Sequence, residues 1–349
     1  MKGKKIARKL VIVSLLAVGA CSRQPSQSTP QSEPSLSPLH TVGRWILNAE
    51  GDTVILRGVN IPSLEWNAAG DQIITSLTHA VDKWKINIAR IPLSQDRWYG
   101  FGPEQSDGGI GYRALVDKLV TLGNRKGCYI WLDLHWNNAG EWGKNIGQHK
   151  MPDDLSATFW RDLARLYADH PAVLFGLYNE PHDVDWGTWR NGGIVTEQLQ
   201  DGALVYHTPG HQALVETIRS VGADNLIIAA GLDWGFDLRG ILSGYALTGE
   251  NIVYDTHPYP WKPKPWDVFF GNVGRIYPII IGEWGGTVAD GHQNYGLEMA
   301  AYLRRNAFCW TAWSFHPTAG PQLIKNWNYD PTWFGELVMR ELATPVELP

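Results

Sequence analysis

The sequence predicts an α/β protein built as a (β/α)8 TIM barrel with an N-terminal β-hairpin. Eight short apolar runs recur along the 349 residues, and segments with helical periodicity separate them. Short apolar runs bounded by breakers suit parallel strands that are covered on both faces, and the alternation of such strands with helices is typical of this barrel. An open doubly wound sheet is the alternative. No Gly-x-Gly-x-x-Gly motif follows the first strand, so nothing supports the dinucleotide-binding form of that alternative.

The expected elements follow one another in barrel order. The N-terminal hairpin is expected from residues 44–47 and 53–56 with a turn at 48–52, and its second arm continues into the first barrel strand, which ends at Asn60. The other seven strands are expected at 86–91, 129–134, 173–178, 225–230, 252–255, 278–281 and 308–313. The helices are expected near 72–84, 112–126, 155–168, 209–221, 266–275, 294–306 and 333–343.

The N-terminal region has the composition of an export signal. Basic residues precede an apolar run at 10–20, so residues 1–20 are expected to be a signal peptide. The end of this segment, Val18-Gly19-Ala20-Cys21, resembles the lipobox of bacterial lipoproteins, which implies a lipid attached at Cys21 and anchoring at the outer membrane or cell surface of a bacterium. An ordinary secretory peptide is the alternative. Residues 21–41 are rich in Ser, Gln and Pro and are expected to be a flexible tether, which leaves 42–349 as the folded domain.

Charge and composition limit the partners that the domain can have. The whole chain has a net charge of −5, and loss of residues 1–20 would leave 25 basic and 35 acidic residues, a net charge of −10. An acidic protein is a poor binder of nucleic acid or anionic lipid. Cys128 and Cys309 lie in apolar runs of non-neighbouring strands and are expected to be buried free thiols. The 18 Trp residues exceed what a core needs, and many lie in polar, Gly-rich segments.

Polar residues of catalytic types follow the predicted strands. In a barrel of this kind, the C-terminal ends of the strands converge on one rim, where active sites are built. Glu180 follows the apolar run 172–177, and Pro181 ends that strand. Glu283 follows the seventh strand in the same way. Two carboxyl groups across a rim are what glycoside hydrolysis needs, because one protonates the leaving oxygen while the other attacks the sugar or activates water.

The remaining residues at the strand ends complete this set. Arg90 and His257 are placed to keep Glu283 ionised, Tyr259 to donate a hydrogen bond to it, and Asn179 to bind a sugar 2-hydroxyl. His135 is either part of the site or a structural histidine with satisfied hydrogen bonds. Asp133 is expected to face the barrel interior or an ion pair.

The ordered motifs resemble those of glycoside hydrolase family 5, the family of many endoglucanases. The resemblance extends from Arg57-Gly58-Val59-Asn60 to Asn326-Trp327-Asn328-Tyr329, and it rests on Arg90, His135, Asn179-Glu180-Pro181, His257-x-Tyr259, Glu283-Trp284-Gly285 and Trp313. It implies a retaining glycoside hydrolase with Glu180 as acid/base, Glu283 as nucleophile and Trp313 as the platform under a sugar ring.

The substrate class that follows is a β-linked polysaccharide or oligosaccharide. Indole rings stack on the apolar faces of sugars, so Trp residues in rim loops are candidate subsites. The candidates besides Trp313 are Trp136, Trp142, Trp186, Trp234 and Trp261. An endo-β-1,4-glucanase is the leading function. A β-mannanase, another β-glucanase and a non-catalytic glycan-binding lipoprotein are the alternatives, and an esterase lacks its Gly-x-Ser-x-Gly elbow. No cofactor, no metal and a monomer are expected.

Overall fold

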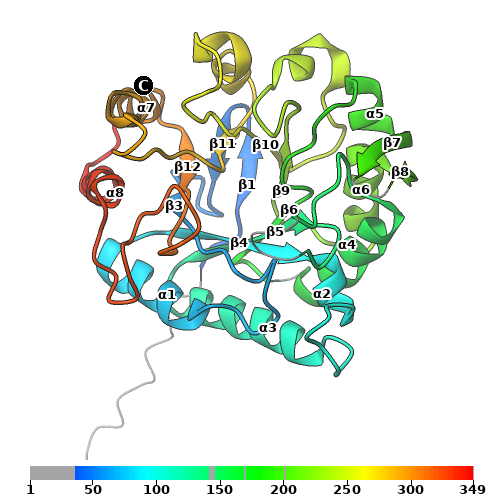
Figure 1. The fold of residues 1–349 in the computed structure, drawn as a ribbon. Helices are drawn as coiled ribbons and strands as arrows, with labels where there is room; N and C mark the ends of the chain where they lie inside the picture. The colour runs from blue at the N-terminus through cyan, green and yellow to red at the C-terminus, as the bar shows by residue number, and fades with distance from the viewer. Residues whose placement is uncertain (1–35, 141–145, 169, 200–201, 349) are drawn as a thin grey trace, which may run out of the picture. The chain divides into compact units, whose positions relative to one another are not determined.

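The structure, a computed structural model, describes residues 36–140, 146–168, 170–199 and 202–348. These residues form the predicted closed barrel of eight parallel strands, in the ring order β3-β4-β5-β6-β9-β10-β11-β12 and back to β3. Figure 1 shows the helices around this ring. The barrel strands are β3 (Arg57–Asn60), β4 (Ile88–Ser94), β5 (Tyr129–Trp136), β6 (Val173–Gly176), β9 (Ile227–Ala230), β10 (Ile252–Asp255), β11 (Ile279–Ile281) and β12 (Cys309–Ala312).

The helices cover the outside of the barrel and begin where their capping residues predict. Asp153 accepts a hydrogen bond from the Ser156 amide at the start of α4, and Thr332 accepts one from the Gly335 amide at the start of α8. The helices are α1 (Ile73–His79), α2 (Gln95–Tyr99), α3 (Ile110–Arg125), α4 (Asp154–Tyr167), α5 (Trp186–Asn191), α6 (Gly210–Arg219), α7 (Gln293–Asn306) and α8 (Trp333–Ala343). The helix expected near 266–275 is replaced by two short turns, η3 (Asp267–Gly271) and η4 (Val273–Arg275). Two further π-helical turns are η1 (Ala80–Trp84) and η2 (Ile241–Tyr245).

The N-terminal hairpin exists, but its pairing differs from the expected one. β2 (Trp45–Leu47) pairs antiparallel with β1 (His40–Val42), which lies before it in the chain. The expected second arm, 53–56, contributes a single bridge between Leu47 and Thr53 before the chain enters β3. β1 therefore begins inside the segment expected to be tether. Gly43, with φ +57°, makes the tight turn between β1 and β2 that places their pairing upstream of the predicted one.

A second hairpin lies between α5 and α6, where the sequence prediction had no strand. β7 (Gly193–Leu199) and β8 (Gly202–Thr208) pair antiparallel over seven residues. The inner face of this hairpin contacts the loop that follows β5, because Tyr206 Oη accepts a hydrogen bond from the Met151 amide at 2.9 Å and Glu197 pairs with His149 at 3.0 Å. The hairpin thus supports a loop that reaches the barrel rim.

Alternation along the strands decides which side chains enter the barrel. Ile88, Trp131 and Val253 belong to a small apolar cluster inside the lower barrel, whereas Ala89 and Leu132 pack outward against the helices. Two residues further along these three strands, the inward positions are charged: Arg90, Asp133 and Asp255. The inward side chains are therefore apolar in the lower part of the barrel, and the polar groups lie toward the C-terminal rim.

Both predicted free thiols are confirmed, since Cys128 and Cys309 are buried and unpaired. None of the helices within the described part of the chain is long and apolar enough to cross a membrane.

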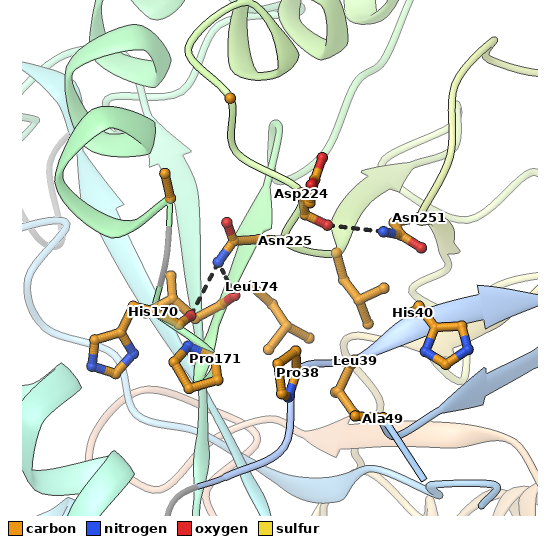
Figure 2. Close-up of a pocket in the computed structure, with 14 residues that line it drawn as sticks. Pro38, Leu39, His40, Ala49, His170, Pro171, Leu174, Asp224, Asn225 and Asn251 are labelled. Atoms are coloured by element: carbon orange, nitrogen blue, oxygen red, sulfur yellow. Dashed lines mark hydrogen bonds between the residues drawn. The ribbon is translucent and has the colours of Figure 1, made fainter. Parts of the chain in front are cut away.

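A cavity of about 420 Å³ lies at the opposite end of the barrel from the polar rim (Figure 2). It is lined by Leu39, next to β1, and by residues that precede or begin barrel strands, such as Asn225 and Leu174. Asn225 Nδ2 donates to the carbonyl oxygens of Tyr167, His170 and Val173, which ties the loop before β9 to the start of β6. These contacts give the N-terminal face a structural role.

Candidate active site

The strand ends bring Glu180 and Glu283 together, as predicted. β6 ends at Gly176, and the chain continues extended, with the Leu177 amide bonded to the Ile228 carbonyl and the Asn179 amide to the Leu134 carbonyl. One oxygen of Glu180 lies within 4.8 Å of one oxygen of Glu283, and both lie within the same distance of a His257 nitrogen. The two carboxyl groups therefore flank one point on the rim.

Glu283 is held in place from three sides. Arg90 Nη1 lies 2.6 Å from Oε1, and Tyr259 Oη donates to Oε2 at 2.7 Å. His257 Nδ1 lies 3.9 Å from Oε1. Burial alone would raise the pKa of Glu283, but the charges of His257 and Arg90 and the Tyr259 hydrogen bond together lower it to about 2. Glu283 is thus an ionised carboxylate at neutral pH.

The backbone before Glu283 is fixed by Asp255. The Gly282 amide donates to Asp255 Oδ1 at 2.7 Å. A Cβ at position 282 would lie 2.4 Å from the same oxygen, so only glycine permits this approach. Asp255 therefore sets the position of the residue after β11 and, through it, that of Glu283.

His257 is a buried cation between carboxylates. Its Nδ1 bonds Glu180 Oε1 and its Nε2 bonds Asp255 Oδ2, both at 3.0 Å. Burial would lower the pKa of His257, but the charges of Glu283 and Asp255 raise it to about 10. At neutral pH both ring nitrogens then carry protons and donate. The expected support of Glu283 by His257 is a charge interaction, and the hydrogen bonds of His257 go to the other two carboxylates.

Arg90 lies at the centre of the polar cluster and is fully buried. Its Nη2 contacts Asp133 at 2.9 Å and donates to Asn179 Oδ1 at 2.6 Å, while its Nη1 also donates to Asn60 Oδ1 at 2.9 Å. The predicted interior position and ion pair of Asp133 are both confirmed. Such a guanidinium stays protonated and links β4, β5, β6 and β11 through side-chain contacts.

Asn179 has a fixed amide orientation. Its Oδ1 accepts from Arg90, and its Nδ2 donates to Gln148 Oε1 at 2.7 Å. Gln148 Nε2 in turn donates to the Glu180 carbonyl oxygen at 2.9 Å. Gln148 thus positions both Asn179 and Glu180. This role of Gln148 was not predicted, because the residue lies in a polar loop and belongs to no recognisable motif.

His135 combines the two roles that the sequence left open. Its Nδ1 bonds Asp133 Oδ2 at 2.8 Å, so it is a satisfied buried histidine. The same ring stacks on Trp313, with centroids 5.4 Å apart and planes 11° apart. Both residues line the cavity that contains the carboxylates.

This cavity is a cleft of about 520 Å³ that contains four of the predicted subsite residues, Trp136, Trp234, Trp261 and Trp313. Trp261 is 68% exposed and stacks on Tyr259 with centroids 4.7 Å apart. An exposed indole on a rigid base is suited to a sugar ring.

Two other predicted subsite residues do not join this cleft. Trp186 packs against Trp189 and Tyr245, and its ring lies so close to Gly240 that a Cβ there would meet it at 2.1 Å. The prediction for Trp186 is therefore wrong: its place in a loop after a strand did not reveal that the ring turns toward the barrel wall. Trp142 lies outside the described residues.

Glu180, His257 and Glu283 are also a set that a metal ion is able to use, since their ligand atoms lie within 4.8 Å of one another. The atoms concerned already satisfy one another or bind Arg90 and Tyr259. A histidine held protonated is a poor ligand. The expected absence of a metal stays a prediction.

A (β/α)8 barrel with paired acids at the C-terminal rim defines the class of barrel glycoside hydrolases. The comparison of sequences agrees, because residues 47–319 match the cellulase family, glycosyl hydrolase family 5. The chain belongs to this family.

The relatives of known function are remote. Endoglucanase MaCel5A of Microbulbifer sp. (strain ALW1) is 24% identical over 290 residues, covering 79% of this chain and 51% of the relative. Endoglucanase N of Pectobacterium atrosepticum is 26% identical over 324 residues, covering 88% of this chain and 65% of the relative. The chain thus spans about half to two thirds of their lengths.

The fold matches solved structures over nearly its whole length. The β-glucanase SdGluc5_26A of Saccharophagus degradans, solved with cellotetraose, has a TM-score of 0.71 at 22% identity, covering 93% of this chain and 98% of that one. The catalytic domain of the Thermobifida fusca endoglucanase Cel5A (E5) has a TM-score of 0.66 at 18% identity, covering 88% and 97%.

Proposed function

We propose that this protein is a retaining endo-β-1,4-glucanase that cleaves internal bonds of cellulose or related β-glucans. The observation that carries the proposal is the pair of acids, with one oxygen of Glu180 within 4.8 Å of one oxygen of Glu283. Retaining enzymes place the two carboxyl groups about 5 to 5.5 Å apart, and inverting enzymes place them roughly 6.5 to 9.5 Å apart to admit a water. The short separation supports retention.

The environments of the two acids support different roles. Glu283 is ionised by Arg90 and His257 and is the nucleophile that attacks the anomeric carbon. Glu180 is the acid that protonates the glycosidic oxygen. Because its Oε1 is bonded to His257, Oε2 is the oxygen available to carry the proton. The attack gives a covalent glycosyl-enzyme. Glu180 then removes a proton from water, which displaces Glu283 and restores the original anomeric configuration.

The neighbours of the acids bind the sugar between them. Asn179 uses one amide proton for Gln148, and the second is free to reach the 2-hydroxyl, a contact that strengthens in the transition state. Trp313, backed by His135, supports the ring at the cleavage point. Trp234 and Trp261 extend the binding surface along the cleft. The names of the remote relatives, endoglucanases and a β-glucanase, support glucan over mannan as the substrate.

The test is a panel of soluble β-glucans, mannans and xylans with product analysis by chromatography. The proposal expects internal cleavage of a β-1,4-glucan, with the β-anomer as the first product seen by proton NMR. Glu283→Ala is the matched inactive control and should bind cellotetraose without cleaving it. Preferred cleavage of mannan would favour the alternative β-mannanase. Release of no reducing ends from any glycan would favour a glycan-binding lipoprotein instead.

We also propose that the protein is exported and anchored by a lipid at Cys21, as a monomer at the outer membrane or cell surface of a bacterium. The support is the lipobox-like Val18-Gly19-Ala20-Cys21 and the following Ser22. These residues lie outside the described part of the chain. Radiolabelled palmitate should be incorporated by the full chain in a bacterial host and not by Cys21→Ala, whereas equal labelling of both would refute the anchor.

A further inference from the structure

A third carboxyl group faces the cleft and has no part in the chemistry above. Glu65 follows β3, lines the same cavity as Glu180 and Glu283, and is only 1% exposed. β3 lies next to β12 in the ring, and β9 lies opposite β3. Glu65 therefore belongs to the side of the cleft that carries Trp313, and Trp234, which follows β9, belongs to the other side.

The carboxyl group of Glu65 is held firmly but is only partly satisfied. The Ser63 amide donates to Oε2 at 2.8 Å, and Arg97 Nη1 donates to the backbone carbonyl of Glu65 at 2.7 Å. Ser63 has φ +136°, a conformation that a residue other than glycine rarely adopts. The backbone amide of Glu65 also lies against the carboxylate and lowers its pKa, and no side chain among the described residues donates to Oε1. Oε1 is not among the fully buried polar atoms that lack a partner, as expected of an oxygen that reaches the cleft, and a strained turn that holds it there indicates a functional role.

In the proposed mechanism, the two sides of the cleft face different halves of the substrate. Trp234 donates its amide to the Pro181 carbonyl and stacks on His182, so it adjoins Glu180, which protonates the leaving group. Trp313 and Glu65 lie on the other side, toward the sugar whose anomeric carbon Glu283 attacks.

We propose that Glu65 is a substrate-binding residue whose Oε1 accepts hydrogen bonds from hydroxyl groups of the sugar on the glycone side of the scissile bond. The inference rests on the proposed glucanase function and adds a polar contact to it. The ligand chemistry is a pair of hydroxyl groups on a β-linked hexose, because a carboxylate accepts from two such donors.

The charges around Glu65 make this contact sensitive to protonation. Burial raises the pKa of Glu65 to about 7, with a smaller rise from Asp133, against lowering by His135 and by the backbone amides of Ser63 and Glu65. The other ionisable groups that face it are Tyr112 and Arg97. Hydroxyl donors stabilise the ionised carboxylate, so substrate binding at pH 7 should expel a proton from Glu65.

The kinetic test compares Glu65→Gln with Glu104→Gln. Glu104 Oε1 accepts from the Ala68 amide at 2.9 Å and from Arg97 at 2.7 Å, so it supports the same loop without lining the cleft. Glu65→Gln should lower kcat/KM for cellotetraose about tenfold or more, mainly through KM, because a hydrogen bond to a charged group is lost. Glu104→Gln should stay near wild type. Equal kinetic constants for the two variants at matched Tm would overturn the proposal.

A second measurement leaves Glu65 in place and does not depend on the folding of its variants. Calorimetric titration of cellotetraose into Glu180→Gln, in two buffers of different ionisation enthalpy, should show proton release at pH 7 that disappears by about pH 9. No release at pH 7 would contradict the proposal. If wild type cleaves glucan but these two results are negative, only the role of Glu65 fails; if wild type cleaves none, the proposed function itself fails.

Discussion

Replacing His257 by Gln removes a positive charge 3.9 Å from Glu283 Oε1 and should move the acid limb of the pH–rate profile upward. At an effective dielectric constant of about 20, unit charges at that distance interact by about 4 kcal/mol, which corresponds to about three pKa units. The pKa of Glu283, about 2 in the wild type, would then rise to about 5. The variant should lose about tenfold in kcat/KM between pH 7 and pH 4, where the wild type stays ionised.

The assay is kcat/KM on a soluble β-1,4-glucan from pH 3.5 to 8. His207→Gln is the matched control, because His207 is an exposed histidine that pairs with Asp154, and neither residue lines the cleft. An acid limb of His257→Gln that coincides with that of the control would refute the assignment of His257 as the charge that keeps Glu283 ionised.

The same substitution leaves a second buried carboxylate without its partner. Asp255 is 1% exposed and keeps only the Gly282 amide on Oδ1 once His257 is gone. Breaking a buried pair on one side costs about 3 to 5 kcal/mol of unfolding free energy. The double variant His257→Gln/Asp255→Asn should recover part of that loss, and the kinetics should be measured well below the Tm of each variant.

Three further outcomes are expected. The pKa of His257 is raised in the folded state, so its contribution to the free energy of unfolding should be complete below about pH 6.5 and should be lost as the pH rises to about 10. The loss should be at most about 5 kcal/mol, measured by urea unfolding. An unfolding free energy that stays constant over this range would contradict the charged histidine. Gln148→Ala should lower kcat at least tenfold with a small change in Tm, since two active-site groups lose their positioning partner, and Gln148→Glu should not restore it. Trp313→Ala should reduce glucan turnover far beyond any loss of stability, and unchanged kinetics would count against the platform role.

The barrel and the rim were predictable because one physical rule governs both. A strand buried on both faces must be apolar, so the first polar residues after each run mark the place where the chain emerges at the rim. This rule located Glu180 and Glu283 without knowledge of any contact, whereas Arg90 lies inside the expected strand 86–91 and was noticed as a charged residue near its end. These residues lie close together because the eight strands close into a ring, and that closure depends on the whole chain.

Side-chain direction and long-range pairing were not predictable from the sequence. Trp186 and Trp234 both occupy loops after strands, but only the contacts of Trp186 with Trp189 reveal that it is packed into the wall. The hairpin β7–β8 carries alternating residues and was in principle detectable, but its length fitted a barrel loop equally well. Gln148 depends on a loop held by that hairpin through the His149–Glu197 pair, so no local pattern identifies it.

The buried charged residues of the site contact one another in sequence, from Asp133 and Asp255 in the barrel interior to Glu283 at the rim. Asp133 and Asp255 bind Arg90 and His257, and these two cations face Glu283. Buried ion pairs add little net stability, so their value here lies in a preorganised field at the carboxylate that reacts. The pKa of His257 is also expected to change during the proposed reaction. Glu283 is the strongest of the charges that raise the pKa of His257, and formation of the proposed glycosyl ester removes that charge. Loss of the Glu283 charge therefore lowers the pKa of His257 toward its ordinary value in the intermediate. His257, which bonds both Asp255 and Glu180, thereby links the charge of the nucleophile to the acid/base.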